Sequence, residues 1–104
     1  MSNQVREIPH PAVDQFDLAT ILRTCGEPLR LALIRLLADG HERNCGDLAA
    51  TLELPISTTS YHLRLLREAG VTRTRAAGTG RWISLRRDDL DARYPGLVDV
   101  LLGR

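Results

Sequence analysis

The chain has 104 residues, of which 43% are hydrophobic and 4% are aromatic, and its formal net charge is +1. A chain of this length forms one domain that buries about 65% of the surface exposed by its unfolded form, and an aliphatic core favours a mainly helical fold. Because no apolar run is long enough to span a membrane and the first residues do not resemble a secretory signal, we expect a cytoplasmic protein without a membrane partner.

The N-terminal part of the chain contains an arm and a first helix. Residues 1–13 hold two prolines and show no hydrophobic periodicity, which predicts a flexible arm before a single domain spanning 14–104. Asp14 and Asp17 resemble a capping box, so a helix is predicted to open there and to end at Cys25.

A second helix is predicted to begin at Pro28, because proline in the first helical turn costs no hydrogen bond. It closes at Asp39, and residues 41–45 are too short for another helix, which predicts a brief strand or a turn. One side of the second helix carries an inward apolar stripe: Leu29, Leu33, Leu36 and Leu37.

Residues 46–69 have the pattern of a helix-turn-helix. A short helix is predicted to start at Gly46 or Asp47, and a turn at 53–56 leads into a second helix at 57–69. The inward face of that helix carries apolar or small residues: Thr59, Leu63, Leu66 and Ala69. Its other face carries hydrogen-bonding side chains suited to base edges and phosphates: Ser57, Thr58, Ser60, Tyr61, Arg64 and Arg67.

A β-hairpin, or wing, is predicted for residues 71–86. Two segments with a period of two flank residues 76–80, which supply the glycines of a hairpin loop. Arg75 and Arg81 are expected to project from the hairpin toward DNA phosphates or the adjacent minor groove. The alternative is a ribbon that only completes the core and leaves its arginines in water.

Positive charge is concentrated on the helix-turn-helix and the wing. Residues 55–87 contain seven arginines and a single acid, Glu68, and carry +6, whereas the rest of the chain holds seven arginines and twelve acids and carries −5. A polyanion such as double-stranded DNA is the partner that this distribution favours. The alternative is a solvated basic face without a partner.

The C-terminal part is predicted to contain a turn capped by Asp88 and a terminal helix that begins at Pro95. Together with the first helix, the terminal helix is a candidate seam for a two-fold homodimer, and the alternative is packing within one subunit. The apolar residues of the terminal helix are Leu97, Val98, Leu101 and Leu102.

The segment from Ser60 to Val71, the glycine-rich wing and Arg81-Trp82 resemble the ArsR family of bacterial winged-helix repressors, and the resemblance covers nearly all of residues 17–102. It implies a mainly α winged helix-turn-helix fold with a small β-hairpin. It also implies a homodimer, joined through its first and last helices, that binds an imperfect inverted repeat and blocks transcription. Thr59 departs from the family pattern, in which an aliphatic residue is usual. The DNA-facing residues implied on the second helix and the wing are Ser57, Thr58, Ser60, Tyr61, Arg64 and Arg81.

No cofactor or metal is expected. Many family members bind metal through a Cys-x-Cys, but Asn44 and Gly46 stand at the matching positions with Cys45 between them, and no histidine follows His62. His62 is predicted to be a packed or a phosphate-contacting imidazole, and the two cysteines to be small residues in or near the core, the alternative being a redox switch.

Two function classes follow from these features. The inventory offers no nucleophile with a base and no phosphate-binding loop, so an enzyme is not expected. We predict a sequence-specific DNA-binding transcriptional regulator, and the alternative is a winged-helix module that binds a protein partner without specific DNA binding. Whether an inducer exists is left open by the sequence.

Overall fold

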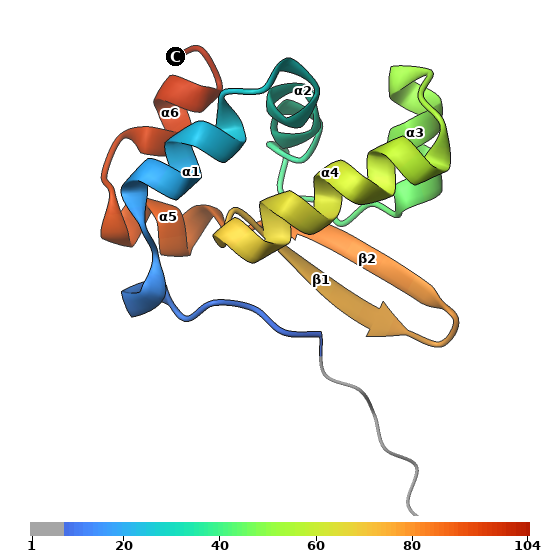
Figure 1. The fold of residues 1–104 in the computed structure, drawn as a ribbon, viewed down its shortest axis with the longest axis horizontal. Coiled ribbons are helices and arrows are strands. Elements are labelled where there is room, and N and C mark those ends of the chain that lie inside the picture. The colour runs from blue at the N-terminus through green and yellow to red at the C-terminus, as the bar shows by residue number, and fades with distance from the viewer. Residues whose placement is uncertain (1–7) are drawn as a thin grey trace, which may run out of the picture.

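Helix α4 crosses the middle of the computed structural model, with α1, α2 and α6 on one side and the β-hairpin on the other (Figure 1). The structure describes residues 8–104. The elements in chain order are a 3₁₀ turn Val13–Gln15, α1 Leu18–Cys25, α2 Pro28–Leu36, α3 Cys45–Leu52, α4 Ile56–Ala69, β1 Thr72–Ala77, β2 Gly80–Leu85, α5 Arg87–Arg93 and α6 Leu97–Leu101. Within this described part, no helix is long and apolar enough to cross a bilayer.

The inward face of α4 follows the predicted helical period. Its buried residues are spaced at i, i+3, i+4, i+7 and i+10, so one stripe faces α1, α2 and α3. Thr59 occupies the place of an aliphatic residue because its hydroxyl donates to the Pro55 carbonyl at 3.1 Å, so no polar atom of this side chain is left unpaired in the core. The buried residues of α4 are Thr59, His62, Leu63, Leu66 and Ala69.

The hairpin is antiparallel, and its two strands extend further into the predicted loop than expected. Ala77 pairs with Gly80, so the turn contains two residues in place of the predicted loop at 76–80, and Gly78 adopts a φ of 59° there. A brief strand or a turn was predicted for 41–45, and the structure has a single β-bridge there, in which Arg43 and Ile83 exchange backbone hydrogen bonds of 2.9 and 2.8 Å. This bridge brings the start of α3 against the wing.

Two predicted helix starts are wrong. The first helix begins at Leu18 because the Asp17 carboxylate accepts a hydrogen bond from the Thr20 amide at 3.0 Å, whereas Asp14 lies in the preceding 3₁₀ turn. The terminal helix begins at Leu97, two residues after Pro95, because Gly96 takes a left-handed φ of 89°. Asp88 lies inside the first turn of α5 and supplies no side-chain cap.

The segment 8–13 lies against the wing and the start of α5. The Thr74 amide donates to Nε2 of His10 at 2.9 Å, and the buried Arg86 guanidinium donates to the Pro11 carbonyl at 2.8 Å. These residues belong to the predicted flexible arm of 1–13, and here they are hydrogen-bonded to the domain; residues 1–7 of that arm lie outside the described residues.

His10 makes the stability of this contact depend on pH. Burial lowers the pKa of His10 below its ordinary 6.5, and the nearby Arg73, Arg86 and Arg67 add to this effect, while a hydrogen bond to the Ile8 backbone opposes it. The neutral ring therefore stabilises the fold above about pH 6.5, and this contribution is lost as pH falls through the lowered folded pKa.

We expect the wild-type chain to lose stability below pH 6.5 relative to His10→Gln, whose amide oxygen accepts the same hydrogen bond without titrating. Urea unfolding of both proteins across this pH range measures the difference, and effects of carboxylates cancel because both proteins contain them. Parallel stability curves would show that protonation of His10 does not change the stability of the fold.

Candidate nucleic-acid interface

The outward face of α4 carries the side chains that sequence reasoning assigned to DNA. Arg64 is half exposed, its guanidinium carbon lies 5.5 Å from the centre of the Tyr61 ring, and its Nη1 lies 3.7 Å from a Glu68 oxygen. Both contacts are to residues of α4, so they orient the guanidinium group along the helix surface. Ser57, Ser60 and Tyr61 are exposed beside it, and Thr58 and Arg67 are partly buried.

The wing places its two candidate arginines on opposite faces. Arg75 pairs across the hairpin with Trp82, whereas Arg81 pairs with Ala76, and adjacent pairs of a ladder point to opposite sides of a sheet. Arg81 therefore shares the face of the buried Ile83, and both line a pocket together with Leu63 of α4. Both arginines are exposed, as expected for projecting side chains, but they lie on opposite sides of the hairpin.

Arg75 on the outer face is held by a carboxylate that the sequence analysis did not single out. Its Nη2 and Nε donate to the two oxygens of Glu42 at 2.8 and 3.0 Å. This hydrogen bond lowers the pKa of Glu42 and raises that of Arg75. Since the pair is exposed, it competes with any phosphate that approaches Arg75.

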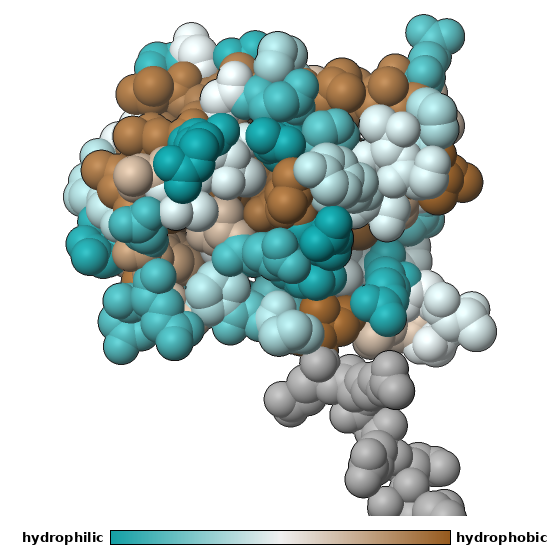
Figure 2. Space-filling view, viewed as in Figure 1, coloured by the Kyte–Doolittle hydropathy of each residue, from teal (hydrophilic) through white to brown (hydrophobic). Residues whose placement is uncertain are grey.

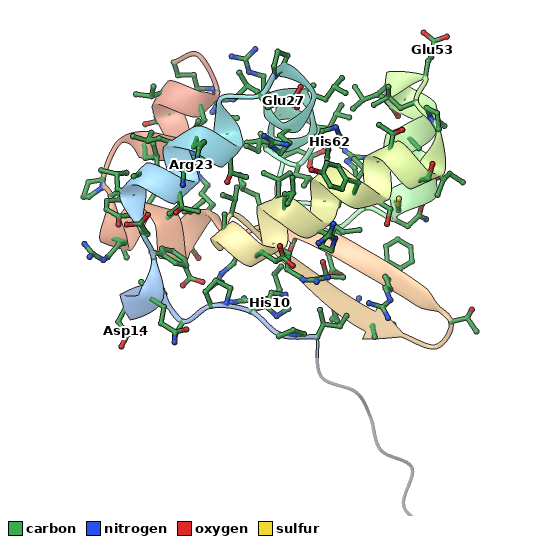
Figure 3. The ribbon with its side chains drawn as sticks, in the orientation of Figure 1. His10, Asp14, Arg23, Glu27, Glu53 and His62 are labelled. Atoms are coloured by element: carbon green, nitrogen blue, oxygen red, sulfur yellow. The ribbon has the colours of Figure 1, made fainter. Side chains whose placement is uncertain are left out.

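We expect Glu42→Gln to strengthen binding to any DNA duplex and to increase the slope of log affinity against log salt by about one, because Arg75 becomes free to neutralise a phosphate. Fluorescence anisotropy with labelled duplex at several salt concentrations measures both quantities. Asp14→Asn makes the same change in net charge on the far side of the domain from the wing tip (Figure 3) and should leave the slope unchanged. Equal effects of the two variants would mean that only net charge matters.

His62 lies behind the outward face of α4, between α4 and α2 (Figure 3). It is 9% exposed, and its Nδ1 lies 3.1 Å from Nη1 of Arg30 and 3.8 Å from a Glu27 oxygen. Arg30 also donates from Nε to the Thr24 carbonyl at 2.6 Å. Of the two predicted roles, the structure therefore supports the packed imidazole and places it away from the exposed face.

Neither cysteine has the surroundings of a reactive thiolate. Cys25 is buried among the core residues, and burial raises its pKa to about 11. Cys45 is the first residue of α3, partly buried, and burial raises its pKa as well. Among residues 8–104, no three His, Cys, Asp or Glu side chains are grouped closely enough to hold a metal ion.

A second exposed feature is an apolar groove between α1 and α6. Figure 2 shows hydrophobic residues gathered over these two helices at the upper left of the view. Leu22 is 49% exposed and Val100 is 70% exposed, although both are aliphatic. Their neighbours in the groove are Leu18, Tyr94, Pro95 and Leu97. This surface lies on the opposite side of α4 from the wing.

Comparison with known proteins agrees with this arrangement. A helix-turn-helix domain family matches residues 26–75. The chain is 37% identical over 84 residues to the uncharacterized HTH-type transcriptional regulator YceK of Bacillus subtilis, which covers 80% of this chain and 84% of that protein.

Two solved structures have the same fold. The homodimeric winged helix-turn-helix DNA-binding domain of Mb0332 from Mycobacterium bovis, a possible ArsR-family transcriptional regulator, matches with a TM-score of 0.69 and 28% identity over 83% of this chain and 78% of that one. The transcriptional repressor BigR from Xylella fastidiosa matches with a TM-score of 0.66 and 30% identity over 83% and 80% of the two chains. The predicted fold class is confirmed, and the chain belongs to the ArsR family of winged helix-turn-helix transcriptional regulators.

Proposed function

We propose that this regulator is a cytoplasmic homodimeric repressor that binds an inverted repeat in double-stranded DNA, with α4 in the major groove and the wing on the neighbouring backbone. The observation that carries the proposal is the outward face of α4, where Ser57, Ser60, Tyr61 and Arg64 are exposed together beside the wing. Hydroxyl and guanidinium groups on one helix face read base edges and bind phosphates.

The candidate residues of α4 and the wing are suited to contacts with different parts of DNA. Arg64 stands near the middle of the helix with its charge in solvent, so it is the candidate for a bidentate contact to guanine. Ser57 and Ser60 lie nearer the N-terminal end, which enters the groove first in helix-turn-helix proteins. Three arginines are assigned to the DNA backbone. Arg67 lies in the last turn of α4, and Arg75 and Arg81 lie in the wing.

Homodimerisation through α1 and α6 supports a two-fold operator. The groove of Leu18, Leu22, Leu97 and Val100 leaves aliphatic side chains in water that a second copy would cover. In a two-fold dimer the groove faces itself, so the two copies of α4 point away from the seam toward successive major grooves.

Leu22→Asp is expected to shift the dimer toward monomer and to reduce operator affinity by at least about tenfold, because each half-site then binds alone. Sedimentation at several protein concentrations measures the association, and the same samples serve for DNA binding. A variant that stays dimeric and binds normally would place the dimer seam elsewhere.

Selection of bound duplexes from a random pool, at two salt concentrations, tests the function. The proposal predicts an enriched inverted repeat whose half-site centres lie about 10 base pairs, or a multiple of one helical turn, apart. Affinity for the enriched duplex should fall steeply with salt. If no sequence is enriched, specific DNA binding is excluded and the exposed surfaces serve a protein partner.

A further inference from the structure

A pocket of about 240 Å³ lies between α4, the wing and the start of α3. It is smaller than the pockets that take drug-sized ligands, which begin at about 300 Å³. Two buried aliphatic residues, Leu63 and Ile83, form part of its wall. The polar residues that line it come from two elements: Ser60, Arg64 and Arg67 from α4, and Thr74 and Arg81 from the hairpin.

The fold brings these polar side chains together by two simple periodicities. Ser60, Arg64 and Arg67 stand at i, i+4 and i+7, so they form one stripe along α4. Thr74 pairs with Ile83, and Arg81 lies two residues before Ile83, so both point from the hairpin face that packs toward α4.

In the part of the chain that the structure describes, two of the three guanidinium groups in this pocket have no carboxylate partner. No carboxylate lines it, although three guanidinium groups do. Within residues 8–104, Arg67 and Arg81 have neither an ion pair nor a side-chain hydrogen bond, and Nε of Arg67 is buried without an acceptor. Every other arginine between residues 64 and 87 has a carboxylate within 4 Å: Arg64, Arg73, Arg75, Arg86 and Arg87. The two arginines without an acid thus face the same small space.

We propose that this pocket binds one phosphate group, and that in the complex with DNA the group is a backbone phosphate of each half-site. A tetrahedral oxyanion presents several acceptors at once, which suits converging guanidinium groups and the hydroxyls of Ser60 and Thr74. The assignment to DNA rests on the proposed function. Free phosphate has the same chemistry and competes for the pocket.

The pocket is tested first without DNA. Inorganic phosphate is titrated into the isotope-labelled full chain at constant ionic strength with chloride, and the amide shifts of Ser60 and Thr74 are followed. We expect a saturable shift that is weakened about tenfold or more in Arg81→Gln, which removes charge-assisted hydrogen bonds. Arg73→Gln is the matched control, because it removes one arginine from the other face of the same hairpin, and it should leave the titration unchanged.

A second experiment tests whether the phosphate group bound in the complex belongs to the DNA backbone. Single backbone phosphates of the selected operator are replaced by neutral methylphosphonates, and one position per half-site is expected to weaken wild-type binding but not Arg81→Gln binding. Absence of a saturable phosphate shift would overturn the pocket even if DNA binds. If the pocket binds free phosphate but every methylphosphonate position affects wild-type and Arg81→Gln binding equally, the assignment of the pocket to a DNA backbone phosphate is wrong. Failure to select any operator would contradict the proposed function alone, since the first experiment does not use DNA.

Discussion

Gly70→Ala is expected to lower the free energy of unfolding by about 2–5 kcal/mol, more than a methyl group added at any other glycine of the chain. Gly70 ends α4 with a φ of 90°, a conformation that costs an L-residue about 1–2 kcal/mol. A Cβ at this position would also lie 2.4 Å from Cε1 of Phe16. The clash adds about 1–3 kcal/mol because Phe16 has little room to move.

The Phe16 ring is held from several sides. It is 6% exposed, and the Arg86 guanidinium carbon lies 5.0 Å from its centre. Arg86 is itself fixed by hydrogen bonds to Asp89 at 2.9 Å and to Pro11 at 2.8 Å. A shift of the ring to admit a methyl group would therefore disturb the segment before α1 and the start of α5 together.

Urea unfolding at one protein concentration measures the loss, and two variants separate its causes. Gly78→Ala introduces the same methyl group at a φ of 59° with no atom within 4 Å, so it should cost only the backbone share of about 1–2 kcal/mol. Adding Phe16→Leu to Gly70→Ala should recover part of the remainder. Equal losses for Gly70→Ala and Gly78→Ala would show that the ring yields without cost.

Arg64→Ala is expected to weaken specific DNA binding by about 1–3 kcal/mol if Arg64 reads a base, or to lower the salt slope by about one if it contacts phosphate alone. The side chain is half exposed and oriented by Tyr61, so its loss removes a positioned donor and leaves the core intact. Anisotropy titrations against the selected operator and a scrambled duplex distinguish the two roles.

Arg23→Ala is the matched control for this experiment. Arg23 is exposed on α1, and its Nη2 lies 3.4 Å from the Thr20 hydroxyl, well away from the wing (Figure 3). It should change neither specificity nor salt slope beyond the small effect of net charge. Unchanged binding by Arg64→Ala would remove Arg64 from the interface.

Local patterns were sufficient for the elements that build the interface. The spacing of Thr59, Leu63 and Leu66 gave the inward face of α4, and the period of two in residues 71–75 gave the first strand of the wing. Both signals come from neighbours in sequence, and α4 buries the side that its pattern indicated. The arginine-rich segment and the exposed face of α4 followed from the same reasoning.

Contacts between distant residues could not be predicted in this way. The hairpin register depends on a two-residue turn at Gly78, and a loop of five residues was expected, so the opposite faces of Arg75 and Arg81 were missed. Glu42 reaches Arg75 only because the Arg43–Ile83 bridge carries it to the wing. The contact between His10 and β1 spans 64 residues, and nothing in the periodicity of the arm indicates it.

The most direct measurement of the central claim is an amide chemical-shift map of the labelled protein with the selected operator and with a scrambled duplex at equal salt. The account predicts operator-specific shifts in residues 56–64 of α4 and around Arg81, with the groove of Leu18, Leu22 and Val100 unaffected. Specific shifts confined to that groove, or identical shifts with both duplexes, would contradict sequence-specific recognition through α4 and the wing.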